Sequence, residues 1–227
     1  MTGMLASVNS LAEAHTILKT SVDIIDLKQP EQGALGALST ETVKQIVQAV
    51  NARKLLSATI GDIPMQAEPV YKAAKAMADT GVDYIKIGFF PGGNWLECLN
   101  ALNQLSEKGF QLIAVLFADT QPEYKIIKTL KQHGFTGVML DTMDKSKGSL
   151  LEIMQMADIE SFVNSANHFQ LLSGLAGSLK IADIPELIDL DADYLGFRGA
   201  LCEGQNRKAK LDINTIDTIL DFFETVR

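Results

Sequence analysis

The feature that most constrains the fold is a regular alternation of short apolar runs with amphipathic stretches along the 227 residues. Eight apolar runs have the length of buried strands, and the stretches between them carry helical patterns. The expected strands cover residues 4–8, 23–28, 55–60, 84–89, 111–118, 137–141, 171–178 and 194–199. About eight strand-then-helix units in roughly this length are typical of a (β/α)₈ barrel.

Local signals agree with this alternation. Ser10 and Glu13 have the spacing of a capping box before a helix at 11–18, and the stretches after residues 39, 94, 121 and 214 have helical spacing. Gly109 and Gly134 stand where helices should end. No linker, charge block or low-complexity segment divides the chain, so we expect the α/β class and a single (β/α)₈ TIM barrel over residues 1–227. A doubly wound open sheet has the same periodicity and stays the alternative.

Charge and cysteine content narrow the partners. A net charge of −8 argues against nucleic acid or an anionic membrane, because those partners require a clustered positive field. Cys98 and Cys202 show no metal-ligand or disulfide spacing, and the N-terminus has no signal-peptide pattern. We therefore expect a cytoplasmic protein without metal or other cofactor. Its expected partners are a phosphorylated small-molecule substrate and further copies of the chain in a homo-oligomer.

Charged residues at the ends of apolar strands point to an active site. Asp26 and Lys28 end the second expected strand on one face, Lys86 lies late in the fourth, and Asp141 ends the sixth. Catalytic groups of a barrel come from these carboxyl ends. A lysine in a partly dry site loses some of its charged form, and a second lysine nearby lowers its pKa further. The neutral amine can then attack a carbonyl group.

A purely structural interpretation stays open for the same residues. Lys28 and Lys86 could form salt bridges with Asp26 and Asp141, in which case all four would only balance charge. Two lysines at two strand ends favour chemistry instead, with the aspartates holding them and moving protons during imine formation. Lys145, four residues beyond Asp141, could reach a phosphate or carbonyl oxygen from its loop.

The last two expected strands carry a candidate phosphate site. Gly177 and Ser178 close the seventh strand, and Arg198 and Gly199 close the eighth. Backbone N–H groups at this end of a barrel often bind phosphate, and an arginine can add a bidentate clamp. Glycines after strands can also simply form turns, so the prediction depends on their paired placement.

At these positions the chain resembles (5-formylfuran-3-yl)methyl phosphate synthase, also called 4-(hydroxymethyl)-2-furancarboxaldehyde-phosphate synthase, of methanofuran biosynthesis. The segments that carry the resemblance are residues 26–30 with the glycines that follow, 57–62, 84–88, 140–142 with Lys145, 175–179 and 196–202. The resemblance spans nearly the whole chain. The sequence departs from the archaeal pattern at Gln29, where asparagine is usual, and at Phe117, where tyrosine is usual.

The resemblance implies a barrel enzyme that joins two glyceraldehyde 3-phosphate molecules and loses phosphate and water. Lys28 matches the family's Schiff-base lysine and Lys86 its proton-transferring lysine, while Asp26, Asp141 and Lys145 match the supporting charged set. The residues alone also fit a class I aldolase that acts on a phosphorylated sugar. A non-catalytic barrel that binds phosphometabolites is the alternative from another class.

Overall fold

The computed structural model describes residues 1–226, with side chains for residues 1–223. Eight parallel strands pair in chain order and β8 pairs with β1, so the sheet closes into a barrel. The strands are β1 (Gly3–Val8), β2 (Ile24–Leu27), β3 (Leu55–Thr59), β4 (Tyr84–Gly88), β5 (Gln111–Phe117), β6 (Gly137–Asp141), β7 (Leu172–Leu175) and β8 (Tyr194–Phe197). The predicted (β/α)₈ barrel is confirmed, and closure excludes the open sheet.

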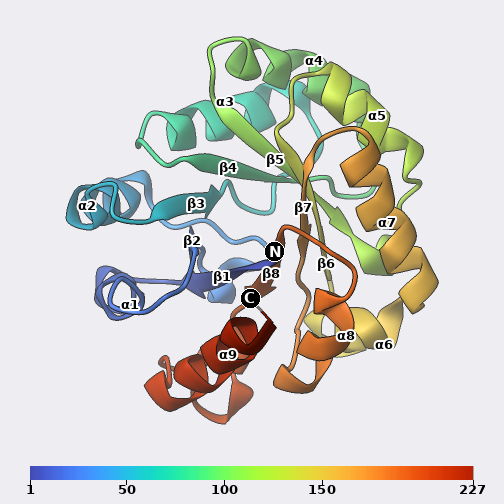
Figure 1. The fold of residues 1–227 in the computed structure, drawn as a ribbon. Helices are drawn as coiled ribbons and strands as arrows, with labels where there is room; N and C mark the ends of the chain where they lie inside the picture. Colours follow the sequence, from blue (N-terminus) through green and yellow to red (C-terminus); the bar gives the residue numbers. More distant parts are fainter. Residues whose placement is uncertain (227) are drawn as a thin grey trace.

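Helices surround the ring of strands (Figure 1). They are α1 (Leu11–Ile17), α2 (Thr40–Val50), α3 (Ala67–Ala78), α4 (Trp95–Ser106), α5 (Lys125–Gln132), α6 (Leu150–Ile153), α7 (Met156–His168), α8 (Ile184–Ile188) and α9 (Ile213–Val226). Gly109 and Gly134 follow α4 and α5 with positive φ, as their predicted role in helix ends requires. Within residues 1–226, none of these helices combines the length and apolar character needed to cross a membrane.

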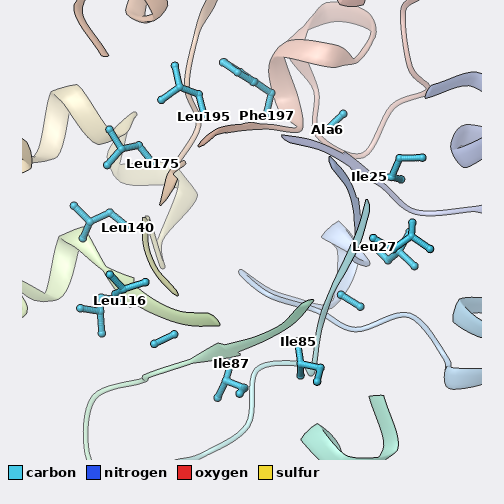
Figure 2. Packing of buried hydrophobic residues seen from close by; sticks show 14 of the residues in the cluster. Ala6, Ile25, Leu27, Ile85, Ile87, Leu116, Leu140, Leu175, Leu195 and Phe197 are labelled. Carbon is cyan, nitrogen blue, oxygen red and sulfur yellow. The ribbon is translucent and has the colours of Figure 1, made fainter. Parts of the chain in front are cut away.

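Side chains of each strand alternate between the helices and the barrel interior. Figure 2 shows Ile25, Leu27, Ile85 and Ile87 pointing away from the ring of strands, toward the helices. Their neighbours in sequence must therefore point inward, because successive strand residues face opposite sides. This alternation turns Asp26 and Lys86 into the barrel.

Strand register then groups the inward polar residues. Asp26 of β2 pairs with Ser7 of β1 and with Ser57 of β3, so the three residues form one row across adjacent strands. In the next pair of strands, β3 and β4, Lys86 of β4 lies opposite Thr59 of β3. A closed parallel barrel therefore brings together side chains that lie far apart in the sequence.

One local prediction is only half right. Ser10 Oγ accepts a hydrogen bond from the Glu13 N–H at 3.3 Å, as in a capping box. The Glu13 carboxylate instead accepts from the Asn9 N–H at 2.9 Å. The cause is tertiary, because the same carboxylate also forms an ion pair with the Arg198 guanidinium.

Candidate active site

Asp26 is fully buried, and both of its carboxylate oxygens accept hydrogen bonds. Oδ2 accepts from Ser7 Oγ at 2.8 Å, and Oδ1 accepts from Ser57 Oγ at 2.6 Å and from Lys86 Nζ at 3.0 Å. Burial alone would raise the pKa of this carboxyl, but the charges of Lys86 and Lys28 outweigh it and lower the pKa. Asp26 is therefore an anion that holds the Lys86 ammonium in place.

Asp141 forms a second buried ion pair. Its Oδ1 accepts from Lys145 Nζ and from the Thr142 N–H, the latter at 2.7 Å, and Lys145 Nζ also donates to Thr142 Oγ1 at 3.0 Å. Burial opposes ionisation of this carboxyl, yet Lys145 and Lys28 lower its pKa to about 2. The loop lysine is thus fixed inside the site rather than solvated.

Lys28 differs from the other two lysines. Its side chain is buried, with 7% of the residue exposed, and within the described residues its Nζ makes no hydrogen bond or ion pair. Burial is the largest influence on its pKa; Asp141 and Asp26 oppose it, Lys145 and Lys86 reinforce it, and the pKa falls to about 8. A purely structural quartet therefore does not describe the site, because Asp141 pairs with Lys145 and leaves the Lys28 amine unpaired.

An open cleft of about 390 Å³ joins these groups to the predicted phosphate site. This volume lies within the range of small-molecule sites. Of the nine predicted site residues, all but Asp26 line the cleft: Lys28, Lys86, Asp141, Lys145, Gly177, Ser178, Arg198 and Gly199. Asp26 is held beneath it, through Lys86.

Two aspartates with no assigned role hold the loops that carry the lysines. Asp62, after β3, accepts from the Ala34 and Leu35 N–H groups at 2.8 and 2.7 Å, in the loop that follows Lys28. Asp119, after β5, accepts in the same way from the two residues that follow Thr142, with both bonds at 2.8 Å. Each carboxylate fixes two consecutive backbone amides of a neighbouring loop, so the mouth of the barrel is preorganised.

The end of β7 differs from the prediction in a way that suits anion binding. The strand ends at Leu175, and Gly177 and Ser178 have φ of 112° and 51°, which no extended strand allows. Among the described residues, the N–H groups of Gly177, Ser178 and Gly199 donate no hydrogen bond. Three unpaired amides thus lie in loops that line the cleft.

Arg198 does not form the predicted clamp in this structure. Its guanidinium donates to both carboxylate oxygens of Glu13, at 2.5 and 3.2 Å. It also donates to the carbonyl oxygens of Arg207, Ser7 and Ala209, at 2.8, 3.1 and 3.2 Å. These bonds use all five guanidinium N–H donors, so the group fastens α1 to the segment after β8 and has no donor left for a phosphate.

Several residues of the site were missed from the sequence. Ser7 and Ser57, the two hydroxyl partners of Asp26, could have been found from the inward parity of their strands. Lys180 and Arg207 line the cleft from loops, where no periodic signal marks them. Among the described residues, no group of three His, Cys, Asp or Glu side chains is placed to hold a metal ion.

The barrel and its lysine-lined cleft define a (β/α)₈-barrel protein with a site at the carboxyl ends of the strands. The sequence profile of the 4-HFC-P synthase family matches residues 4–220. The chain therefore belongs to the 4-HFC-P synthase family, a family of enzymes.

Individual relatives agree with this assignment. A Methylorubrum extorquens protein provisionally named (5-formylfuran-3-yl)methyl phosphate synthase is 41% identical over 209 residues, covering 92% of this chain and 86% of the relative. The (5-formylfuran-3-yl)methyl phosphate synthase of Methanococcus maripaludis strain C7 is 30% identical over 229 residues, covering 96% of this chain and 97% of the relative. The 3-hexulose-6-phosphate synthase structure from Salmonella typhimurium has a TM-score of 0.67 at 14% identity, covering 96% of this chain and 98% of that one, and shares the fold.

Proposed function

We propose that the chain condenses two molecules of glyceraldehyde 3-phosphate into (5-formylfuran-3-yl)methyl phosphate, with loss of phosphate and water, in methanofuran biosynthesis. In this proposal the reaction proceeds through a Schiff base on Lys28, and the enzyme is a carbon–oxygen lyase that acts on phosphates. The observation that carries it is the buried, unpaired amine of Lys28, with a pKa of about 8, in the cleft. Membership of the 4-HFC-P synthase family supports the product.

Imine formation begins when the neutral Lys28 amine attacks the aldehyde carbon of one triose phosphate. The carbonyl oxygen takes up a proton, and the resulting carbinolamine loses water to give the imine. The imine then acidifies the adjacent carbon, so a proton can leave and the carbon can attack the second aldehyde. A pKa near 8 suits this role, because a useful fraction of the amine is neutral near pH 7.

Lys86 is proposed to move protons during the enolisation and the dehydrations. It lines the same cleft as Lys28, and its Nζ is held 3.0 Å from Asp26 Oδ1. Asp141 and Lys145 line the same cleft as a second fixed pair that can exchange a proton with leaving oxygen atoms. Each lysine thus has a carboxylate that fixes its position, except the one proposed to become covalent.

The loops after β7 and β8 are proposed to bind a substrate phosphate. The N–H groups of Gly177, Ser178 and Gly199 are free to donate, and backbone amides at this end of a barrel are common phosphate ligands. Arg198 supports this site indirectly, since its five bonds fix the segment after β8. In this proposal Arg198 positions the loop that binds the phosphate, and it does not contact the phosphate directly.

The decisive experiment is incubation of the pure chain with glyceraldehyde 3-phosphate alone, read by ultraviolet absorbance of a furan aldehyde and by mass spectrometry of the product. Borohydride added during turnover should attach the substrate to Lys28, and peptide mapping should locate it there. Lys28→Arg keeps the charge without a nucleophilic amine, so it should abolish product and adduct while the fold is retained. An adduct on Lys86 or Lys145 with Lys28 unmodified would refute the assignment.

The same experiment separates the alternatives. A class I aldolase would form the adduct and cleave or make a simple sugar phosphate, yet give no furan chromophore from triose phosphate alone. A barrel that only binds phosphometabolites would give neither product nor adduct. Either result would reject the proposed reaction.

A further inference from the structure

The basic side chains of the cleft fall into two groups. Four have a carboxylate partner within 4 Å, and the pairs are Lys86 with Asp26, Lys145 with Asp141, Lys180 with Glu152, and Arg198 with Glu13. Among the described residues that line the cleft, Lys28 and Arg207 are the cations without such a partner. Lys28 is already assigned to the imine, so Arg207 is the remaining cation; Asp141 and Asp62 attract its charge, but neither forms a salt bridge with it.

Arg207 also has unused hydrogen-bond donors. It is half-buried, and its Nη2 donates to the Gly33 carbonyl oxygen at 2.9 Å. An arginine carries five N–H donors, so four of them have no partner among the described residues. A guanidinium with free parallel donors matches the geometry of a phosphate group.

The fold holds Arg207 over the loop that follows Lys28. The carbonyl oxygen of Arg207 accepts a hydrogen bond from Arg198 Nε at 2.8 Å. An isolated antiparallel β-bridge between Cys202 and Leu211 joins the two ends of the surrounding segment. The side chain of Arg207 crosses from the segment after β8 to Gly33 in the β2–α2 loop. The backbone of Arg207 is therefore held by Arg198, and its guanidinium is held at Gly33, where it lines the cleft.

We propose that Arg207 binds a phosphate group of the substrate at a second anion position, beside the β2–α2 loop. We place this position apart from the amides of Gly177, Ser178 and Gly199, because the guanidinium reaches away from its own segment to Gly33. The inference rests on the proposed function, in which two triose phosphates bring two phosphate groups into one cleft. The backbone amides accommodate one phosphate, and the unpaired guanidinium accommodates the other, without any covalent step.

The test is a titration of the full chain with inorganic phosphate, followed by calorimetry, for wild type, Arg207→Ala, Arg207→Lys and Lys208→Ala. Wild type should bind two phosphates. Arg207→Ala should bind one unchanged and the other about 10- to 100-fold more weakly, as expected for losing hydrogen bonds to a charged group. Arg207→Lys should lie between them, because lysine keeps the charge without the planar fork.

Lys208→Ala is the matched control. It removes an equal charge from the adjacent, exposed residue, which does not line the cleft, so it should bind phosphate like wild type. Circular dichroism and the melting temperature should be the same for Arg207→Ala and Lys208→Ala. The proposal is overturned if Arg207→Ala matches wild type in number and affinity of bound phosphates, or if Lys208→Ala loses as much affinity.

Turnover gives an independent readout. With glyceraldehyde 3-phosphate, Arg207→Ala should raise KM by about 10-fold or more while changing kcat less, because the contact binds ground and transition states alike. If the wild-type chain makes no furan product, the proposed function fails. The phosphate titration needs no turnover, so it still decides the role of Arg207.

Discussion

The pKa of Lys28 can be tested through its neighbours. Its value of about 8, against an ordinary 10.5, leaves roughly one tenth of the amine neutral at pH 7, compared with roughly one part in 3,000 for the ordinary lysine. The gain in reactive amine is therefore on the order of 300-fold. Below about pH 8 the amine is mostly protonated, so its reactivity should rise with pH up to that value and then level off.

Two substitutions should move this pKa in opposite directions. Asp141 raises the pKa of Lys28 and Lys145 lowers it. Asp141→Asn should therefore lower the midpoint, and Lys145→Gln should raise it, each by roughly one pH unit, or about 1.4 kcal/mol. Asp141→Asn is nearly isosteric, and Lys145→Gln shortens a side chain that is partly exposed, so the packing should survive.

The assay is competitive labelling with a trace of acetic anhydride from about pH 6 to about pH 11, a range that includes both the lowered pKa of Lys28 and the ordinary pKa of a lysine. Peptide mass spectrometry reports the modification of Lys28 at each pH. The exposed Lys208 in the same sample corrects for changes in reagent reactivity. A Lys28 midpoint near 10.5 in wild type, or shifts of the same sign in both variants, would refute the electrostatic reasoning.

Three further substitutions test the parts of the site separately. Lys86→Gln keeps a hydrogen-bond donor for Asp26 but removes the amine. Borohydride should still trap substrate on Lys28, while release of the furan product stops. Near-normal product formation would show that Lys86 does not transfer the protons. Asp119→Ala removes two charge-assisted hydrogen bonds to the loop before Lys145, which costs about 3 kcal/mol of local stability. Amide hydrogen exchange of that loop should become faster. Unchanged exchange would contradict the proposal that Asp119 holds the loop in place. Glu13→Gln breaks the ion pair that the buried Arg198 forms with a partly buried carboxylate, so the melting temperature should fall by roughly 6–12 °C for a loss of about 3 kcal/mol. An unchanged value would show that the pair contributes little.

Periodicity in the sequence was sufficient for the strands and for the side on which their residues lie. Each expected strand overlaps an observed one, because runs of buried apolar residues with period two are a local property of the chain. The same parity placed Asp26 and Lys86 inside the barrel, and the strand-end positions of Lys28 and Asp141 brought them to one cleft. The positions of these residues follow from the strands that carry them and from the closure of parallel strands into a barrel.

Pairing of the charges was decided only by the tertiary structure. The sequence shows charged residues at strand ends or just beyond, but it does not show that Asp141 pairs with Lys145 and leaves Lys28 unpaired. Likewise, Arg198 follows a strand, as a clamp would, yet its donors are all used by Glu13, by the Ser7 carbonyl oxygen and by two carbonyl oxygens of the loop that follows it. Hydrogen-bond partners depend on which loops meet at the barrel mouth, and loop conformation carries no periodic signal from which that meeting could be read.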